Sequence, residues 1–309
     1  MWTPESRNHY DRKGLRDPSD MTNSEWALIQ PLSPPAKCSG RKREVNPCVV
    51  VNHIFYVLQH GYKRFIQKNL LPTSTYYEYL KLWEWDVTLD CIYYALYYAL
   101  YVQVRELAEK EANPTAAVID SQSVKATERG GASPYPIGYD TGKKFKVIKR
   151  HIVVNTLGMI LTEEIQSTNI QHRDGALLVL KKERRLFVFV KKIFADGGSQ
   201  GQAMVTAVAA LGQWNIEIFK QSESTKGFVV LIKRWIVEIT FGWLGRCWRF
   251  AKHFENLTRT TLAFFRLAMI RLMVRRIAQT AVQQGSYWTD SSQRLWNQSV
   301  LVLLITVTY

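Results

Sequence analysis

The chain has 309 residues, of which 41 are Lys or Arg and 26 are Asp or Glu, so its formal net charge at pH 7 is +15. This length exceeds one average domain and predicts a main domain with a smaller module. The charge makes an acidic polymer, above all nucleic acid, the expected partner, with a membrane surface as the weaker alternative. Four cysteines without CxxC spacing argue against a zinc ribbon or a disulfide framework and fit a reducing cytoplasm.

The sequence offers no clear membrane segment. The N-terminal stretch MWTPESRNHYDRKG lacks the apolar run of a signal peptide. The longest apolar run, VLVLLITV, is well short of the roughly 20 residues that a spanning helix needs. We therefore expect a soluble, cytoplasmic protein without a membrane partner.

The first part of the chain predicts a flexible N-terminus (residues 1–21) and a small all-α module (22–112). Thr22 and Glu25 have the spacing of a capping box, which begins a short helix. Asn46 followed by Pro47 begins a second helix that closes at Gly61. Further helices are expected over 74–85 and about 89–110. Helices with such short links are compatible with a helix-turn-helix-like DNA-binding module, and a packing unit without DNA contact is the alternative.

After Asn113 and Pro114 the pattern changes to short β-rich runs, and we place a domain over residues 113–282. A hairpin is expected across Leu157 and Gly158, and helices over 174–182 and 202–211. The expected strands cover 116–119, 150–156, 159–166, 187–195 and 216–220. This order predicts an α/β fold with one mixed sheet flanked by helices. Residues 283–309 form an atypical C-terminal tail.

Two of the predicted strands end on an aspartate, Asp120 after AAVI and Asp196 after FVFVKKIFA. Ligand sites in α/β sheets lie beyond the carboxyl ends of strands, where an acid sits on a rigid support while its oxygens reach solvent or an ion. The alternative is that each aspartate merely caps the turn that follows it.

A third acid stands out on a helix predicted over residues 233–252. At about 100° per residue, Glu238 lies opposite a broad apolar face. Two glycines share its side of the helix, although each weakens a helix by about 1 kcal/mol. An ordinary solvent face with i,i+4 ion pairs is one explanation; a closely approaching backbone, of protein or nucleic acid, is the other. The residues within about 40° of Glu238 are Arg234, Gly242, Gly245, Arg249 and Lys252.

Three carboxylates among many cations have a coherent joint chemistry. Phosphodiester cleavage needs neutralised nonbridging oxygens, an activated attacking oxygen and a stabilised leaving oxygen, and two Mg²⁺ ions about 4 Å apart supply all three. Magnesium prefers oxygen ligands and few of them from protein, so two Asp and one Glu suffice. The basic residues would then bind the DNA backbone, with a solvated face as the alternative. The predicted DNA-contacting residues are Lys143, Lys144, Lys146, Lys149, Arg150, Arg234, Arg246, Arg249 and Lys252.

Several blocks in this order resemble bacterial insertion-sequence transposases of the DDE class, close to the insertion-sequence-five group. The N-terminal DMTNSEWALIQPLSPP and YYEYLKLWEWD resemble the helical module of that group. The resemblance covers roughly residues 12 to 280. The blocks of the second domain are VIDSQSVKATERGG, GYDTGKKFK, KRHIVVNTLGMIL, NIQHRDGA, ADGGSQG and KRWIVEITFGWLGRCWRFAKHFENLT.

The resemblance implies a ribonuclease-H-like fold, cleavage at terminal inverted repeats and strand transfer into target DNA. It implies a catalytic, metal-holding triad of Asp120, Asp196 and Glu238, two Mg²⁺ ions with Mn²⁺ as a substitute, and no other cofactor. Arg234 matches the Arg that this class places four residues before its Glu. DNA would be the partner, in a homodimer on paired ends, within the bacterial nucleoid.

The chain also departs from the pattern of these relatives. Ile239 stands where they carry Arg, Gly245 where they carry Lys, Ser199 and Gln200 replace Tyr-Arg, and Val147 and Ile148 replace Gly-Arg. Two further hypotheses therefore remain: a metal-dependent nuclease that cuts without joining, and a decayed relative that binds DNA without catalysis.

Overall fold

The structure is a computed structural model, and its described residues form two compact units. One unit groups residues 1–110 with 263–309, and the other comprises 111–262. The predicted flexible N-terminus up to residue 16 and the predicted tail from residue 284 lie outside the described residues. The description covers residues 17–33, 45–61, 71–96, 115–127, 138–140, 144–167, 175–181, 190–195, 206, 208–209, 214–218, 232–255 and 257–283.

The first helix of the helical unit, α2 (Asn23–Ile29), begins with the predicted capping box. The Thr22 hydroxyl accepts a hydrogen bond from the backbone N–H of Glu25 at 3.2 Å. The Glu25 carboxylate in return accepts one from the backbone N–H of Thr22 at 2.9 Å. Two amide groups that the first helical turn leaves unpaired are thereby satisfied. A 3-10 turn, η1 (Gln30–Leu32), follows.

The next two helices also confirm the prediction. In α3 (Pro47–His60) the Asn46 side chain accepts from the backbone N–H of Cys48, and the helix ends at Gly61, whose φ of 71° suits a residue without a Cβ. The helix α4 (Thr73–Trp85) follows. Of the helix predicted over about 89–110, residues 89–96 are described and helical, and the remainder lies outside the described residues.

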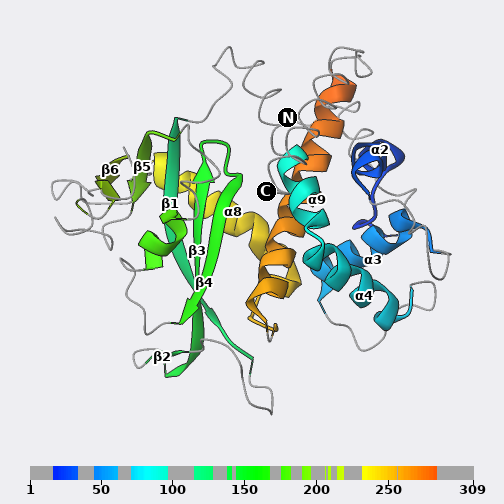
Figure 1. Cartoon of the computed structure of the whole chain (residues 1–309), viewed down its shortest axis with the longest axis horizontal. Helices are drawn as coiled ribbons and strands as arrows, with labels where there is room; N and C mark the ends of the chain where they lie inside the picture. The colour runs from blue at the N-terminus through cyan, green and yellow to red at the C-terminus, as the bar shows by residue number, and fades with distance from the viewer. Residues whose placement is uncertain are drawn as a thin grey trace. The chain divides into compact units, whose positions relative to one another are not determined.

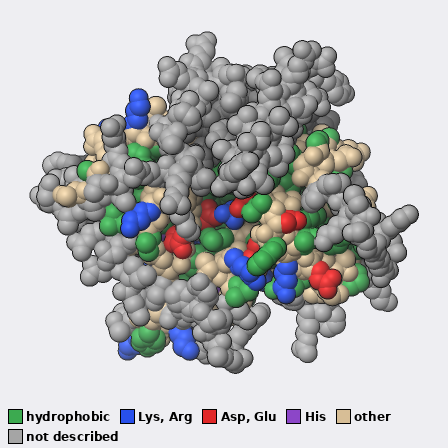
Figure 2. Space-filling view, in the orientation of Figure 1, with side chains coloured by type: hydrophobic (Ala, Val, Ile, Leu, Met, Phe, Trp, Pro, Cys, Tyr) green, Lys and Arg blue, Asp and Glu red, His purple; other side chains and the backbone are tan. Residues whose placement is uncertain are grey.

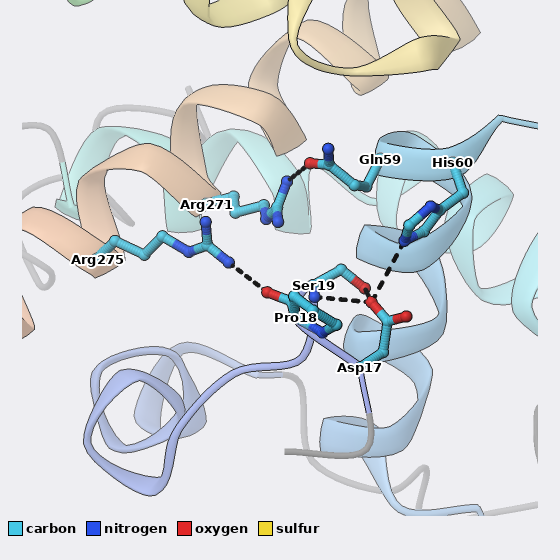
Figure 3. A network of polar contacts seen from close by, with 7 residues as sticks. All are labelled: Asp17, Pro18, Ser19, Gln59, His60, Arg271 and Arg275. Carbon is cyan, nitrogen blue, oxygen red and sulfur yellow. Dashed lines mark hydrogen bonds and ion pairs between the residues drawn. The ribbon is translucent and has the colours of Figure 1, made fainter. Parts of the chain in front are cut away.

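The C-terminal helix α9 (Thr258–Gln283) belongs to the helical unit from Ala263 onward. Three of its arginines hold residues from the N-terminal part of the chain. Arg266 pairs with Asp90 at 2.8 Å. Arg271 donates to the Gln59 side chain, and Arg275 donates to the carbonyl oxygen of Pro18 at 2.9 Å (Figure 3).

Figure 3 also shows how the loop before α2 is fastened to the end of α3. The Asp17 carboxylate accepts hydrogen bonds from the backbone N–H and the hydroxyl of Ser19, at 2.8 and 2.6 Å. It also lies 3.3 Å from Nε2 of His60, in the last turn of α3. The Asp17 contact joins the start of the described chain to α3, and the arginines of α9 join its C-terminal part to the same unit. The helical unit therefore includes both ends of the described chain.

The second unit is built on a six-stranded mixed sheet (Figure 1). Its strands are β1 (Ala116–Lys125), β2 (Gly138–Asp140), β3 (Phe145–Asn155), β4 (Ile160–Ser167), β5 (Lys192–Ala195) and β6 (Asn215–Ile218). The order is β2-β3-β1-β5-β6, with β4 also paired to β3. β3 is antiparallel to β1, β2 and β4, whereas β5 is parallel to both β1 and β6. This is the predicted ribonuclease-H-like fold.

The centre of the sheet is enclosed on both faces. Every residue of β3 from Val147 to Asn155 is buried, which is the pattern of a strand covered on both sides. The helix α8 (Ile232–Gly245) packs against β1 and β3. Residues 175–181 form the predicted helix over 174–182, and its Val179 and Leu180 are fully buried.

The structure covers only parts of the other predicted elements. Of the strand predicted over 187–195, residues 192–195 form β5; residues 190 and 191 are described outside a strand, and 187–189 lie outside the described residues. The strand predicted over 216–220 forms β6, one residue earlier at its start. Residues 206, 208 and 209 are helical within the helix predicted over 202–211. None of the described helices combines the length and apolar character needed to cross a bilayer.

The predicted hairpin between β3 and β4 turns at Gly158, which has a positive φ of 74°. The Asn155 side chain stabilises the turn by accepting from the backbone N–H groups of Leu157 at 2.9 Å and Met159 at 3.0 Å. A Cβ at Gly158 would lie 2.9 Å from the Trp243 ring and 3.0 Å from the Thr240 hydroxyl, both on α8. Gly158 therefore serves both the turn and the close approach of α8.

We predict that Gly158→Ala lowers the free energy of unfolding by about 1–3 kcal/mol, because it adds overpacking against α8 to left-handed backbone strain. Gly242→Ala is the matched control: apart from its chain neighbours and the adjacent backbone of its own helix, no described atom lies within 4 Å of the Cβ it would add. The control should gain up to about 1 kcal/mol from helix propensity. Urea unfolding followed by circular dichroism measures both, and equal shifts would contradict this account of Gly158.

Candidate active site

β1 carries Asp120, the first of the three predicted carboxylates. The strand continues to Lys125, so the prediction that it ends at Ile119 is wrong. Within the described residues, β1 pairs with β5 over Ala116 to Ile119, and its pairing with β3 continues to Lys125, which keeps residues 120–125 in the strand. Asp120 is half-buried and pairs with Ile152 of β3. Its carboxylate accepts a 2.6 Å hydrogen bond from the backbone N–H of Ser121.

The second predicted carboxylate, Asp196, lies outside the described residues. The residue before it, Ala195, is the last residue of β5 and is fully buried. Ala195 is in register with Ile119, the residue before Asp120. Asp196 thus follows in sequence the residue that pairs with Ile119, just as Asp120 follows Ile119.

The third predicted carboxylate, Glu238, lies on the exposed side of α8. Val237, Thr240 and Leu244 form the buried side of this helix, each at most 2% exposed. This confirms the predicted orientation of Glu238 away from the apolar face. Because α8 packs against β1, Asp120 and Glu238 belong to elements in direct contact.

A buried contact fixes α8 on the sheet two residues after Glu238. The Thr240 hydroxyl lies 2.8 Å from the carbonyl oxygen of Gly158, to which it donates, and 3.0 Å from that of Ile236 in its own helix. The Trp243 ring covers the same glycine. This contact limits both sliding and rotation of the helix. Helical periodicity places Thr240 on the apolar face opposite Glu238, but nothing in the local sequence indicates its partner in the hairpin.

α8 ends at Gly245, so the prediction of a helix continuing to residue 252 is wrong. The chain tightens there: the backbone N–H of Arg246 donates to Trp243, and that of Cys247 to Leu244, which is 3-10 spacing. A separate 3-10 turn, η3 (Trp248–Phe250), follows. Arg249 and Lys252 consequently do not share the helical stripe of Glu238.

One predicted DNA-contacting residue, Arg150 on β3, is 2% exposed and points into the protein. Its guanidinium donates to the carbonyl oxygens of Phe250 at 2.9 Å and Lys252 at 3.3 Å. It also lies over the Phe250 ring, 5.3 Å from the ring centre. Burial lowers the pKa of Arg150 to about 10, which leaves it charged at neutral pH. Arg150 therefore holds the segment after α8 in place.

A second predicted DNA-contacting residue, Arg249 on η3, is also buried, at 6% exposure. It forms an ion pair with Glu255, whose side chain is 10% exposed, and lies over the Phe254 ring. Breaking a buried pair of this kind is costly because the remaining charge has no partner. Both arginines thus have internal structural roles.

The other predicted DNA-contacting cations are distributed unevenly. Lys149 is buried, Lys143 lies outside the described residues, and the side chain of Arg234 is likewise not described. On the face shown in Figure 2, the described Lys and Arg side chains are dispersed among acidic and apolar ones. The exposed members of the predicted set are Lys144, Lys146, Arg246 and Lys252.

The segment after η3 returns to the end of β1 and extends the sheet. His253 donates its backbone N–H to Lys125 at 2.9 Å and accepts from Thr127 at 3.0 Å, in a bridge opposite Ala126. Its side chain is buried, and burial together with the charges of Arg150 and Arg249 lowers its pKa from 6.5 to about 4. The imidazole is therefore neutral at physiological pH.

Among the described residues, no three His, Cys, Asp or Glu side chains gather closely enough to hold a metal ion. Asp196 is not one of these described residues. The donors that the structure does describe, Asp120 and Glu238, are carboxylates on a strand and on a packed helix, which suits a hard cation such as Mg²⁺.

Comparison with known families agrees with this architecture. A family model described as the transposase DDE domain matches residues 111–273. The chain belongs to this family. A second model, for candidate transposases of the IS4/5 family, matches residues 21–93. No curated protein and no solved structure matches the chain.

Membership in the DDE transposases confirms the resemblance seen in the sequence. It makes the chain an enzyme of the nuclease and nucleotidyl-transferase kind that acts on DNA, in a family that generally uses divalent metal ions. The DDE domain match contains Asp120, Asp196 and Glu238, and the second match contains α2, α3 and α4.

We predict that His253 makes the protein acid-labile. Its folded pKa of about 4 lies below the unfolded value of 6.5, so the unfolded chain binds more protons between these values. Stability is therefore full above pH 6.5 and falls as the pH drops toward 4, by about 3 kcal/mol in total. His253→Gln, which cannot gain this proton, should lose that part of the pH dependence. Urea unfolding across this range tests it, and identical slopes in both proteins would contradict it.

Proposed function

We propose that this DDE transposase cleaves DNA at the ends of its element and joins the released ends to target DNA, with Asp120, Asp196 and Glu238 as the catalytic carboxylates. The supporting observation is the strand register. Ala195, which precedes Asp196, lies beside Ile119, which precedes Asp120. The helix packed on the same strand presents Glu238 on its exposed side.

The three carboxylates would hold two Mg²⁺ ions, with Mn²⁺ as a substitute. They offer only oxygen donors, and they leave positions for water and substrate, as this ion requires. When bound, the two ions neutralise the nonbridging phosphate oxygens and stabilise both the attacking and the leaving oxygen. The contribution of the chain is to fix the carboxylates, through the pairing of β1 and the Thr240 contact of α8.

The proposed reaction has two displacements at phosphorus. In the first, a water oxygen bonds to phosphorus, the bond to the 3′ oxygen breaks, and that oxygen takes a proton to become a free 3′ hydroxyl. In the second, this hydroxyl attacks a phosphorus of target DNA and displaces a target 3′ oxygen, which is protonated in turn. Neither step needs an oxidant or a reductant.

We further propose that the helical module recognises the terminal repeats and that two copies act on paired ends. The IS4/5-family match, to residues 21–93, covers most of the described N-terminal helices. Backbone contacts in the catalytic unit would come from Lys144, Lys146, Arg246 and Lys252, which are exposed. Such contacts make DNA affinity strongly dependent on salt.

We predict that Asp120→Asn, Asp196→Asn or Glu238→Gln each lowers cleavage by about 10³-fold or more, because each removes several kcal/mol of transition-state stabilisation. Glu217→Gln is the control, since Glu217 pairs with Lys192 on β5 at the surface. The assay uses a short duplex carrying the terminal repeats that flank the gene, with Mg²⁺, Mn²⁺ or chelator.

The products of this assay separate the alternatives. Nicked and joined products that need metal and all three carboxylates support the proposal. Nicking without joined products indicates a plain nuclease. Binding that persists in chelator, with no cleavage under either metal, indicates a decayed DNA-binding relative. Full cleavage by any of the three carboxamide variants would contradict the assigned site.

A further inference from the structure

The central strand β1 carries an exposed glutamine two residues after Asp120. Ala117 to Ile119 are buried and Asp120 is half-buried, whereas Gln122 is exposed. Residues two apart on a strand point their side chains to the same face, and their Cα atoms are about 7 Å apart. Gln122 therefore lies beside Asp120 on one face of the sheet, and its amide reaches solvent there.

The pairing of β1 with β3 identifies this face. Gln122 is directly opposite Arg150 in the antiparallel register, so the two side chains share a face. The Arg150 guanidinium donates to the carbonyl oxygens of Phe250 and Lys252, which follow α8 in the chain. Asp120 and Gln122 thus point to the side of the sheet on which the segment after α8 lies.

Positive charge lies next to the Gln122 amide. Opposite residues of an antiparallel pair have their Cβ atoms only about 4.5–5.5 Å apart, so the Arg150 side chain leaves the sheet beside Gln122. Arg150 is charged at neutral pH, and Lys252, whose carbonyl oxygen it holds, is exposed. A neutral N–H donor beside cations favours an anionic acceptor, because hydrogen bonds to charged groups are the stronger ones. In a protein that acts on DNA, that acceptor is a phosphate oxygen.

Glutamine suits this position better than a charged residue does. A lysine two residues from Asp120 would compete with a cation for its carboxylate, and an acid would repel DNA phosphates. The amide of glutamine carries no charge and offers two N–H donors. Gln122 can therefore bind a phosphate oxygen without disturbing the charge balance at Asp120.

We propose that Gln122 is a substrate-binding residue that donates its side-chain amide to a phosphate within about two nucleotides of the cleaved one. Successive charges of one DNA strand are about 3.4 Å apart along the duplex axis, so the distance from Asp120 to Gln122 spans about two of them. This assignment depends on the proposed function in one respect, that the cleaved phosphate is held at Asp120. The contact fixes the register of the strand and so aligns the cleaved bond with the carboxylates.

We predict that Gln122→Ala lowers cleavage of a terminal-repeat duplex about 10- to 150-fold, as expected for one lost hydrogen bond to a charged group. Gln122→Glu, which is nearly the same size, should lower it further by placing a carboxylate against the phosphate. Lys125→Gln is the matched control, since it also changes the net charge by −1. Lys125 is exposed on the same strand but on the opposite face, over the Phe145 ring. The control should stay within a few-fold of the unmodified protein.

The phosphate is identified with duplexes that carry a single uncharged methylphosphonate at successive positions around the cleavage point. In the unmodified protein, this substitution at the contacted position should weaken both binding and cleavage. In Gln122→Glu the same substitution should strengthen both, because it removes the repulsion between two negative charges. Fluorescence anisotropy measures binding without requiring cleavage. Equal responses of the two proteins at every position would overturn the proposal.

The outcomes distinguish the Gln122 contact from the proposed function. If Gln122→Ala cleaves normally, the contact is wrong while the transposase proposal stands. If binding shows the opposite responses at one position but no protein cleaves DNA, the contact stands and the proposed catalysis fails. If the defect of Gln122→Ala depends on the identity of a base and not on any methylphosphonate, Gln122 reads a base and the phosphate contact is overturned.

Discussion

The position of α8 on the sheet is the constraint on which the rest of the site depends. The helix reaches the hairpin turn only because Gly158 has no Cβ, and it is held there by the Thr240 hydroxyl and the Trp243 ring. A hydroxyl buried without a partner would be costly, so this hydrogen bond favours one placement of the helix over neighbouring ones. Since Glu238 is on the exposed side of α8, opposite this contact, the same contact also fixes where the Glu238 carboxylate lies.

A basic chain uses part of its charge for internal structure. Arg150 is removed from water at a cost, and two carbonyl oxygens and the Phe250 ring compensate for it. Arg249 is similarly matched by Glu255. Together they direct the chain after α8 back to β1, where His253 bridges to Ala126. Net charge therefore indicates the partner of this protein, but it does not identify which cations touch that partner.

Elements that depend on a few adjacent residues, such as helix caps and turns, were predicted well. The errors arose where contacts between residues far apart in the sequence determine the structure. The capping box at Thr22, the Asn46 cap and the turn at Gly158 depend on a few adjacent residues, so they could be predicted. The helix was predicted to extend past Gly245 because the apolar periodicity of the sequence gives no sign of the 3-10 hydrogen bonds that end α8. The burial of Arg150 depends on carbonyl groups about 100 residues away, which no local pattern encodes.

The boundary of the catalytic unit shows a different limit of sequence patterns. The DDE family match extends to residue 273, whereas the compact unit ends at residue 262, within α9. The family match reflects shared ancestry of the sequence, whereas the compact unit is defined by packing. From Ala263 onward, arginines of α9 contact Asp90, Gln59 and Pro18, which belong to the helical unit. The catalytic unit is thus inserted between two segments of the helical unit. A fragment that ends at residue 93, where the family match ends, would contain Asp90, Gln59 and Pro18 but would lack the arginines of α9 that contact them. The helical unit therefore requires both segments.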